Sequence, residues 1–173
     1  MTAPDVTTTA AIARYVFIDL DRELEATRRV LERVPDGQFD WKPHGKSMSL
    51  GQIAGHVAEL PSFARMILEL DEYDFASGQW KPAKPATTAE VLALFDETSA
   101  KLRAAVAAAG DESLAGTWTL RHGAHVIVTG NRAALARTMG INHILHHRSQ
   151  LGVYLRLLDV PVPGLYGPSA DER

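Results

Sequence analysis

Apolar residues recur at helical spacing in four long stretches of the chain, with charged or small residues between them. Steps of three, four or seven residues place side chains on one face of an α-helix. These stretches extend from Ile12 to Val34, from Leu50 to Ile67, from Val91 to Val106, and from about Asn131 to Leu158. They predict four long helices, and four such helices with long crossings are typical of an all-α four-helix bundle.

Capping residues and a proline define where these helices begin or end. Pro35 ends the first helix, and Ser49 with Gln52 can form a reciprocal capping box at the start of the second. Thr87 caps the third helix and Asn131 caps the fourth. The predicted helices therefore have local start and stop signals as well as helical periodicity.

Three segments depart from regular helical spacing. Pro61 falls inside the second helical pattern, where its ring and its missing amide hydrogen predict a kink or a local break. Residues 116–128 contain β-branched residues and a glycine turn, which predict a short hairpin or extended crossover before the last helix. Pro161 and Pro163 then take the tail out of helical geometry, and we expect this tail to pack back on the helices.

The composition is that of one globular domain. The chain has 173 residues, of which 46% are hydrophobic and 23% charged, and this length is typical of a single domain. We therefore expect one domain over residues 1–173. The net charge of −3 and the lack of a Lys/Arg stripe with interleaved aromatic residues argue against nucleic acid as a partner.

Signals for export or membrane insertion are also missing. The N-terminus has no basic segment followed by an apolar one, and no apolar run approaches the roughly 20 residues of a membrane span. We therefore expect no membrane association and a cytoplasmic location. The chain has no cysteine, so any sulfur in its chemistry has to arrive with a substrate.

Three histidines carry the candidate chemistry. His143 and His147 are four residues apart, which places both imidazoles on one face of the last helix, one turn apart. His56 points toward the core in the second helical pattern and is the natural third ligand. Three neutral imidazoles leave a coordination position open, as in catalytic metal sites. His146 follows His143 by three residues, and spacing alone does not choose between His146 and His147.

Two further residues are candidates for catalysis. Glu59 follows His56 by one turn, so its carboxylate can orient that imidazole or accept a proton from a bound water, and a solvated or salt-bridged glutamate is the alternative. Tyr154 follows His147 by two turns on the same stripe, and its hydroxyl either lines a pocket or belongs to the core. Histidines in loop or hairpin segments are assigned no role, namely His44, His122 and His125.

Several motifs occur together in a characteristic order along the chain. They are Trp41-Lys42-Pro43, the segment Lys46 to Gly51, the segment Gly55 to Leu60 around His56, the segment His143 to Leu151, and the tail Pro161 to Glu172. With these motifs the sequence resembles the DinB-like (YfiT-like) superfamily of metal-dependent proteins, from about Glu23 to Glu172. The order and spacing of the motifs make the resemblance specific.

The resemblance implies a fold and a site. It implies an up-down-down-up four-helix bundle, usually dimeric, with one divalent metal on three histidines that match His56, His143 and His147. Members of known activity include S-transferases that use bacterial low-molecular-weight thiols and a thiol-dependent maleylpyruvate isomerase. One departure is Ser149, where the family commonly has glycine, and this change concerns helix packing and leaves the ligands untouched.

The leading hypothesis is a divalent-metal-binding protein that acts as a metal-dependent transferase on a low-molecular-weight thiol and a small electrophile. Zn²⁺ or Ni²⁺ are the expected metals, because imidazoles suit late first-row ions. A homodimer is the expected assembly, because the last helix is apolar on more than one side. One alternative is a metal-dependent hydrolase that uses metal-bound hydroxide. The other is a non-enzymatic stress-response module that binds a metal or a ligand.

Overall fold

The computed structural model describes residues 10–172, and most of them are helical. The helices are α1 (Ala11–Val16), α2 (Leu20–Leu31), α3 (Leu50–Glu69), α4 (Thr88–Ala108), α5 (Asp111–Ala115), α6 (Arg132–Leu135) and α7 (Asn142–Leu157). Shorter helical elements are the 3-10 turns η1 (Phe75–Ser77) and η3 (Ala170–Glu172) and the π-helical segment η2 (Ala136–Ile141). The strands are β1 (Glu72–Asp74), β2 (Thr117–His122) and β3 (His125–Asn131).

Two of the sequence expectations concern membranes and export. Across residues 10–172, none of the helices combines the length and the apolar character that crossing a membrane requires. The expected lack of an export signal falls partly on residues 1–9, which lie outside the described part of the chain. The structure therefore bears only on the membrane-spanning question.

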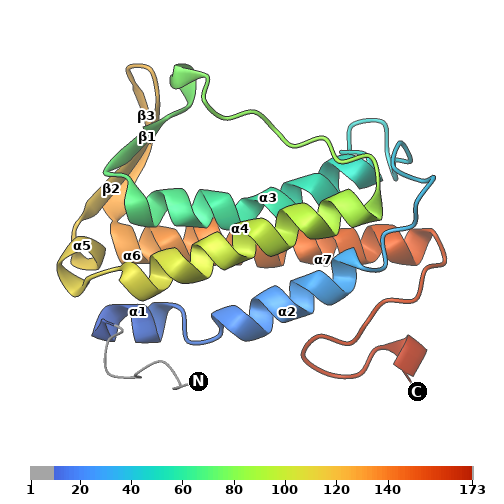
Figure 1. Ribbon diagram of the computed structural model, residues 1–173. Coiled ribbons are helices and arrows are strands. Elements are labelled where there is room, and N and C mark those ends of the chain that lie inside the picture. Colours follow the sequence, from blue (N-terminus) through green and yellow to red (C-terminus); the bar gives the residue numbers. More distant parts are fainter. Residues whose placement is uncertain (1–9, 173) are drawn as a thin grey trace.

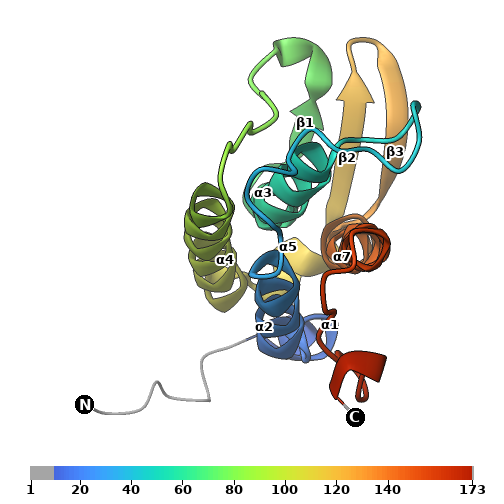
Figure 2. The same ribbon diagram turned by 90° about the vertical axis from the view of Figure 1, so that its right-hand side faces the viewer.

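Four long helices lie side by side (Figure 1). Viewed end-on, α2, α3, α4 and α7 occupy the corners of a four-sided arrangement (Figure 2). Both α2 and α3 contact α4 and α7. In Figure 1, α2 and α7 run from left to right, whereas α3 and α4 run from right to left. Large apolar side chains fill the core, and each stabilises the fold by roughly 1.5–3 kcal/mol through burial. They include Leu24, Leu31, Leu50, Ile53, Leu60, Phe95 and Leu102.

A small sheet at one end of the helices corrects the all-α prediction (Figure 1). The predicted hairpin is present, since β2 and β3 pair antiparallel on either side of Gly123, which has a φ of 58°. The sequence pattern does not predict β1, which pairs in parallel with β2. Arg121 of β2 joins these two strands through ion pairs with Glu72 (2.6 Å) and Asp74 (2.7 Å). The fold is therefore mostly helical with a three-stranded mixed sheet.

The first predicted helix is wrong in one respect, because residues 17–19 interrupt it and separate α1 from α2. Asp19 occupies the N-cap position of α2, but its side chain makes no capping hydrogen bond. Its carboxylate instead accepts two hydrogen bonds from the guanidinium of Arg137, at 2.5 and 2.9 Å. The hydrogen bond from Arg137 lowers the pKa of Asp19. A contact between residues so distant in sequence is not visible in local periodicity.

Helix α3 begins with the capping box that the sequence predicts. Ser49 Oγ accepts a hydrogen bond from the Gln52 amide at 3.2 Å, and Gln52 Oε1 accepts one from the Ser49 amide at 2.8 Å. Of the kink or local break expected at Pro61, the break is absent, because α3 continues through this residue. Thr98 of α4 donates a hydrogen bond to the carbonyl of Ala58 (2.7 Å), so a neighbouring helix supports α3 one turn before the proline.

The last predicted helix begins at its expected cap, but it is not uniform. Asn131 Oδ1 accepts a hydrogen bond from the amide of Ala134 at 3.0 Å. The π-helical segment η2 then separates α6 from α7, and the sequence does not predict it. A π turn inserts one residue, which rotates the face of the following helix by about 100°. Gly140 of η2 lies so close to α3 that an added Cβ would be 2.7 Å from the Cβ of Ala64.

The C-terminal tail packs back on the helices, as predicted. Val162 and Leu165 lie against the apolar core. The hydroxyl of Tyr166 accepts a hydrogen bond from Arg148 (2.7 Å) and donates one to Glu23 (2.8 Å). The tail is therefore attached to both α2 and α7.

We expect Gly140→Ala to lower the free energy of unfolding by about 1–3 kcal/mol, because the new methyl group overlaps the backbone and Cβ of Ala64. The matched control is Gly152→Ala in α7, where the added Cβ would meet only Val162 Cγ1 at 3.8 Å. The control should be neutral or stabilised by up to about 1 kcal/mol, because alanine is the better helix former. Urea denaturation of the two variants measures the difference, and a Gly140→Ala protein as stable as the parent would contradict the close contact.

Candidate metal centre

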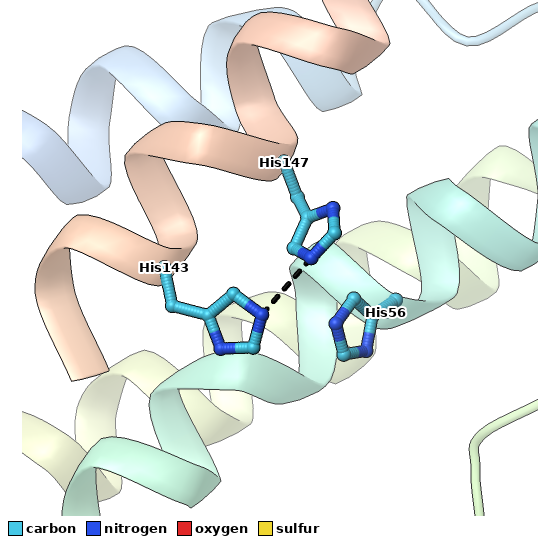
Figure 3. A group of neighbouring side chains, drawn as sticks. All are labelled: His56, His143 and His147. Carbon is cyan, nitrogen blue, oxygen red and sulfur yellow. Dashed lines mark hydrogen bonds between the residues drawn. The ribbon is translucent and has the colours of Figure 1, made fainter. Parts of the chain in front are cut away.

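Three imidazoles from two helices meet beside the core (Figure 3). His56 comes from α3, and His143 and His147 come from successive turns of α7. The ring centre of His56 is 5.4 Å from that of His143 and 4.6 Å from that of His147, and the α7 pair is 4.7 Å apart. One ring nitrogen from each histidine lies within 4.8 Å of the others. In residues 10–172, these three side chains form a group that can hold a metal ion.

The contact between η2 and α3 positions this group. Gly140 and Ala64 mark a point of close approach between the two elements. The two helices α3 and α7 run in opposite directions (Figure 1). His56 lies before Ala64 in α3, and His147 lies after Gly140 along the chain, so both histidines lie on the same side of the contact. Both separations cover about two helical turns. The two ligand-bearing faces therefore meet at the same level.

Two of the imidazoles have a side-chain partner on the side that faces away from the group. Nδ1 of His56 is 3.2 Å from Oε1 of Glu59, and Nδ1 of His147 is 2.7 Å from Oε1 of Gln150. An oxygen acceptor requires a proton on the ring nitrogen that faces it, which leaves Nε2 of the same neutral ring with a free lone pair. Both rings are thus held in the tautomer that metal ligation through Nε2 requires.

His143 and His147 are hydrogen-bonded to each other through their inward nitrogens (Figure 3). Nε2 of His143 lies 2.9 Å from Nε2 of His147, and because Nδ1 of His147 faces Gln150, His143 is the donor and His147 the acceptor. A metal ion bound by both nitrogens would take the place of this proton. Metal–nitrogen bonds of about 2.0–2.1 Å place tetrahedral ligand atoms about 3.3 Å apart, close to this spacing. The residues therefore fit a divalent metal ion.

A cavity of about 680 Å³ opens beside His56. His56 and Glu59 line it from α3, and Phe39, Met48 and Trp80 give it apolar walls. This volume is typical of sites for small molecules. A small molecule in the cavity would lie against His56, whereas His143 and His147 are not among the residues that line it.

A sequence model of the DinB superfamily matches residues 19–151. The chain belongs to the DinB superfamily. The crystal structure of a DinB-like protein, YjoA, from Bacillus subtilis is similar to this chain, with a TM-score of 0.64 and 16% sequence identity, over 94% of this chain and 98% of that one. At this identity the similarity shows the fold alone. A search of curated proteins gave no match.

In this DinB-superfamily protein, burial favours the neutral form of both α7 imidazoles. Burial lowers the pKa of His147 to about 4, and the nearby His56 and His143 add to the effect, while the hydrogen bond with Gln150 opposes it. Burial lowers the pKa of His143 as well. The neutral imidazole is the form that binds metals. Both α7 histidines therefore keep a lone pair available in mildly acidic solution.

The structure separates the group of three from the other histidines. His146 is exposed and lines a different hollow on the outer face of α7, although its ring centre is 4.8 Å from that of His147. His147 thus belongs to the group of three imidazoles, and His146 does not. Three further histidines also lie outside the group, namely His44, His122 and His125.

The two residues predicted for catalysis have different surroundings. Glu59 lies against His56 and lines the cavity. Tyr154 donates a hydrogen bond to the carbonyl of Met48 (3.2 Å), and its ring packs on Trp41 with centres 5.8 Å apart. These two contacts place Tyr154 in the packing between α7 and the segment that precedes α3.

Sequence reasoning missed one side-chain partner of the imidazoles. Gln150 follows His147 by three residues, which is the same offset as Glu59 after His56, so the repeated spacing is a signal that the sequence contains.

We expect the stability of the metal-free protein to fall as the pH drops from about 6.5 toward 4. The unfolded His147 takes up a proton near 6.5, whereas the folded one does so only near 4, so the unfolded state binds more protons in this window and acid favours it. His147→Gln should flatten this part of the curve of unfolding free energy against pH. His125→Gln, at an exposed hairpin position, is the control. An unchanged curve for His147→Gln would show that His147 is not the group responsible.

Proposed function

We propose that this protein is a metal-dependent transferase that joins a low-molecular-weight thiol to a small electrophilic molecule. The convergence of three imidazoles, two of which have the outward nitrogen hydrogen-bonded to a side chain, beside a cavity of small-molecule size carries the proposal. Zn²⁺ and Ni²⁺ suit three imidazoles. The resemblance to thiol-using members of the superfamily supports the thiol, and the chain has no cysteine of its own to occupy the remaining position.

His56, His143 and His147 would hold a divalent ion, which would supply a Lewis acid that favours a thiolate over a thiol and polarises an electrophile. The residues of the chain have the other tasks. Glu59 and Gln150 hold the outward nitrogens of their imidazoles and keep the Nε2 lone pairs directed inward. The apolar walls of the cavity exclude water from the side on which a substrate would lie.

We also assign α2, α3, α4 and α7 to the up-down-down-up bundle of the superfamily. Their directions and their contacts support this assignment. In such a bundle the two ligand-bearing helices are antiparallel neighbours, which is the arrangement that α3 and α7 have.

The same proposal includes a homodimer formed through the outer face of α7. Val153 and Leu157 are 59% and 58% exposed, and they are four residues apart on one stripe of the helix. Ser149 continues this stripe, and its hydroxyl donates to the carbonyl of Leu145 (2.9 Å), so the departure from glycine adds no unpaired polar group to the face. A twofold axis would cover the same stripe on both copies.

Metal binding should stabilise the fold, because the ligands come from two helices. Removing metal with a chelator should lower Tm. Adding Zn²⁺ at a hundredfold excess over Kd should raise the free energy of unfolding by about 3 kcal/mol. His56→Ala, His143→Ala and His147→Ala should each abolish the recovery, whereas His122→Ala in the hairpin should not. Scanning fluorimetry with elemental analysis measures both effects, and equal metal content in His56→Ala and the parent would remove the site.

Thiol titration into the cobalt-substituted protein completes this test. Direct binding of a thiolate should give a strong sulfur-to-metal charge-transfer band, and absence of the band would contradict the transferase. A hydrolase would lack the band and turn over activated esters or amides. A binding module would show neither behaviour.

We expect light scattering to give the mass of a dimer for the parent. Val153→Glu and Leu157→Glu should each give a monomer, because a charge at the centre of an apolar interface is not solvated there. Ile127→Glu, at an exposed apolar position of the hairpin, is the control and should remain dimeric. A monomeric parent at micromolar concentration would exclude the dimer.

A further inference from the structure

Glu59 has two different partners for its two carboxylate oxygens. It is 7% exposed and lies one turn after His56 on α3. Oε1 lies 3.2 Å from Nδ1 of His56, and Oε2 accepts a hydrogen bond from the backbone amide of Ala83 at 2.8 Å. Ala83 belongs to the irregular segment between η1 and α4, here called loop 78–87. One buried side chain thus joins a candidate metal ligand to a loop distant in sequence.

Loop 78–87 packs against α3 on both sides of His56. On one side, an added Cβ at Gly55 would lie 2.8 Å from Cδ of Pro85, so the loop is in close contact with the helix backbone there. On the other side, Trp80 packs edge-on against Phe63, with ring centres 6.3 Å apart.

The same loop forms a wall of the 680 Å³ cavity that His56 lines. Trp80, Ala83 and Lys84 all contribute to this wall. The position of the loop therefore determines the shape of the cavity next to the candidate metal.

We propose that Glu59 is a positioning residue with two simultaneous tasks, a role that rests on the proposed function of the metal centre. It holds His56 in the tautomer whose Nε2 faces His143 and His147, and it holds loop 78–87 as the wall of the substrate cavity. The wall and the ligand are thereby attached to one carboxylate. A change in the position of either is transmitted to the other through Glu59.

Only a carboxylate serves both partners, because both of its oxygens accept hydrogen bonds. A glutamine at this position has one acceptor. If its oxygen faces His56, its NH₂ group meets the Ala83 amide, donor against donor, and the loop contact is lost. If its oxygen faces Ala83, its NH₂ group donates to Nδ1 of His56 and moves the ring proton to Nε2, which removes the lone pair from the metal side.

The experiment compares Glu59→Met, Glu59→Gln and the control Glu69→Gln. Methionine is close to glutamate in length and accepts neither hydrogen bond, whereas Glu69 is an exposed residue of the same helix that pairs with Arg65. Three readouts apply: Zn²⁺ affinity by competition with a chromophoric chelator, hydrogen exchange of the loop amides, and ¹⁵N NMR of the His56 tautomer in metal-free protein. NMR at about pH 8 keeps free imidazoles neutral.

Glu59→Met should weaken Zn²⁺ binding by about 10–100-fold and speed exchange of the loop amides. Glu59→Gln should lose one of the two contacts, so either the exchange of the loop amides or the His56 tautomer should change while the other stays as in the parent. Glu69→Gln should change neither. Ala83→Pro, which removes the amide donor of the loop and leaves Glu59 in place, should change the exchange of the loop amides and leave the His56 tautomer unchanged. Parent values for both loop exchange and Zn²⁺ affinity in Glu59→Met would overturn the proposal, as would a Glu59→Gln protein that preserves both contacts.

These outcomes are separate from the fate of the proposed function. The tautomer and the loop exchange are measured without metal, so they decide the role of Glu59 even if the parent binds no Zn²⁺. A parent that binds Zn²⁺ and thiol, together with a Glu59→Met protein that behaves identically, would overturn the role of Glu59 and leave the transferase standing.

Discussion

The close packing of η2 against α3 is the contact on which the rest of the site depends. Gly140 and Ala64 allow the two backbones to approach each other, and a larger side chain at either position would separate the helices. The histidines lie about two turns from this contact, and one ring nitrogen from each lies within 4.8 Å of the others. Separating the two helices would increase the distance from His56 to His143 and His147. The metal-binding geometry is therefore a property of two small residues as much as of the three histidines.

Charges on the opposite side of α7 anchor the same helix. Arg148, next to His147, is buried and pairs with Glu23 of α2 at 2.8 Å, and Tyr166 of the tail contacts both. Burial alone would raise the pKa of Glu23, but the hydrogen bonds from Tyr166 and Arg148 outweigh it and the pKa is lowered. A buried pair of this kind contributes little net stability, yet removing one partner is costly. We infer that its main effect is to fix the rotation of α7.

Local signals explain which parts of this structure the sequence predicts. Periodicity and capping residues predict α3 and α4, the glycine turn predicts the hairpin, and the family resemblance selects the histidines that come together. The unpredicted parts depend on distant partners. The three residues of β1 become a strand only beside β2, the interruption before α2 accompanies the pairing of Asp19 with Arg137, and η2 has no distinct local pattern.

The distribution of the ligands along the chain has a consequence for folding. His143 and His147 share a helix, so their mutual geometry exists as soon as that helix forms. His56 joins them only after α3 has packed against η2 and α7. Such long-range steps are slow, because the entropy cost of closing the loop comes before the stabilising contacts form. A partly folded chain thus offers an ion two imidazoles, and only the native chain offers three. Ion affinity then reports on completed tertiary packing rather than on helix formation.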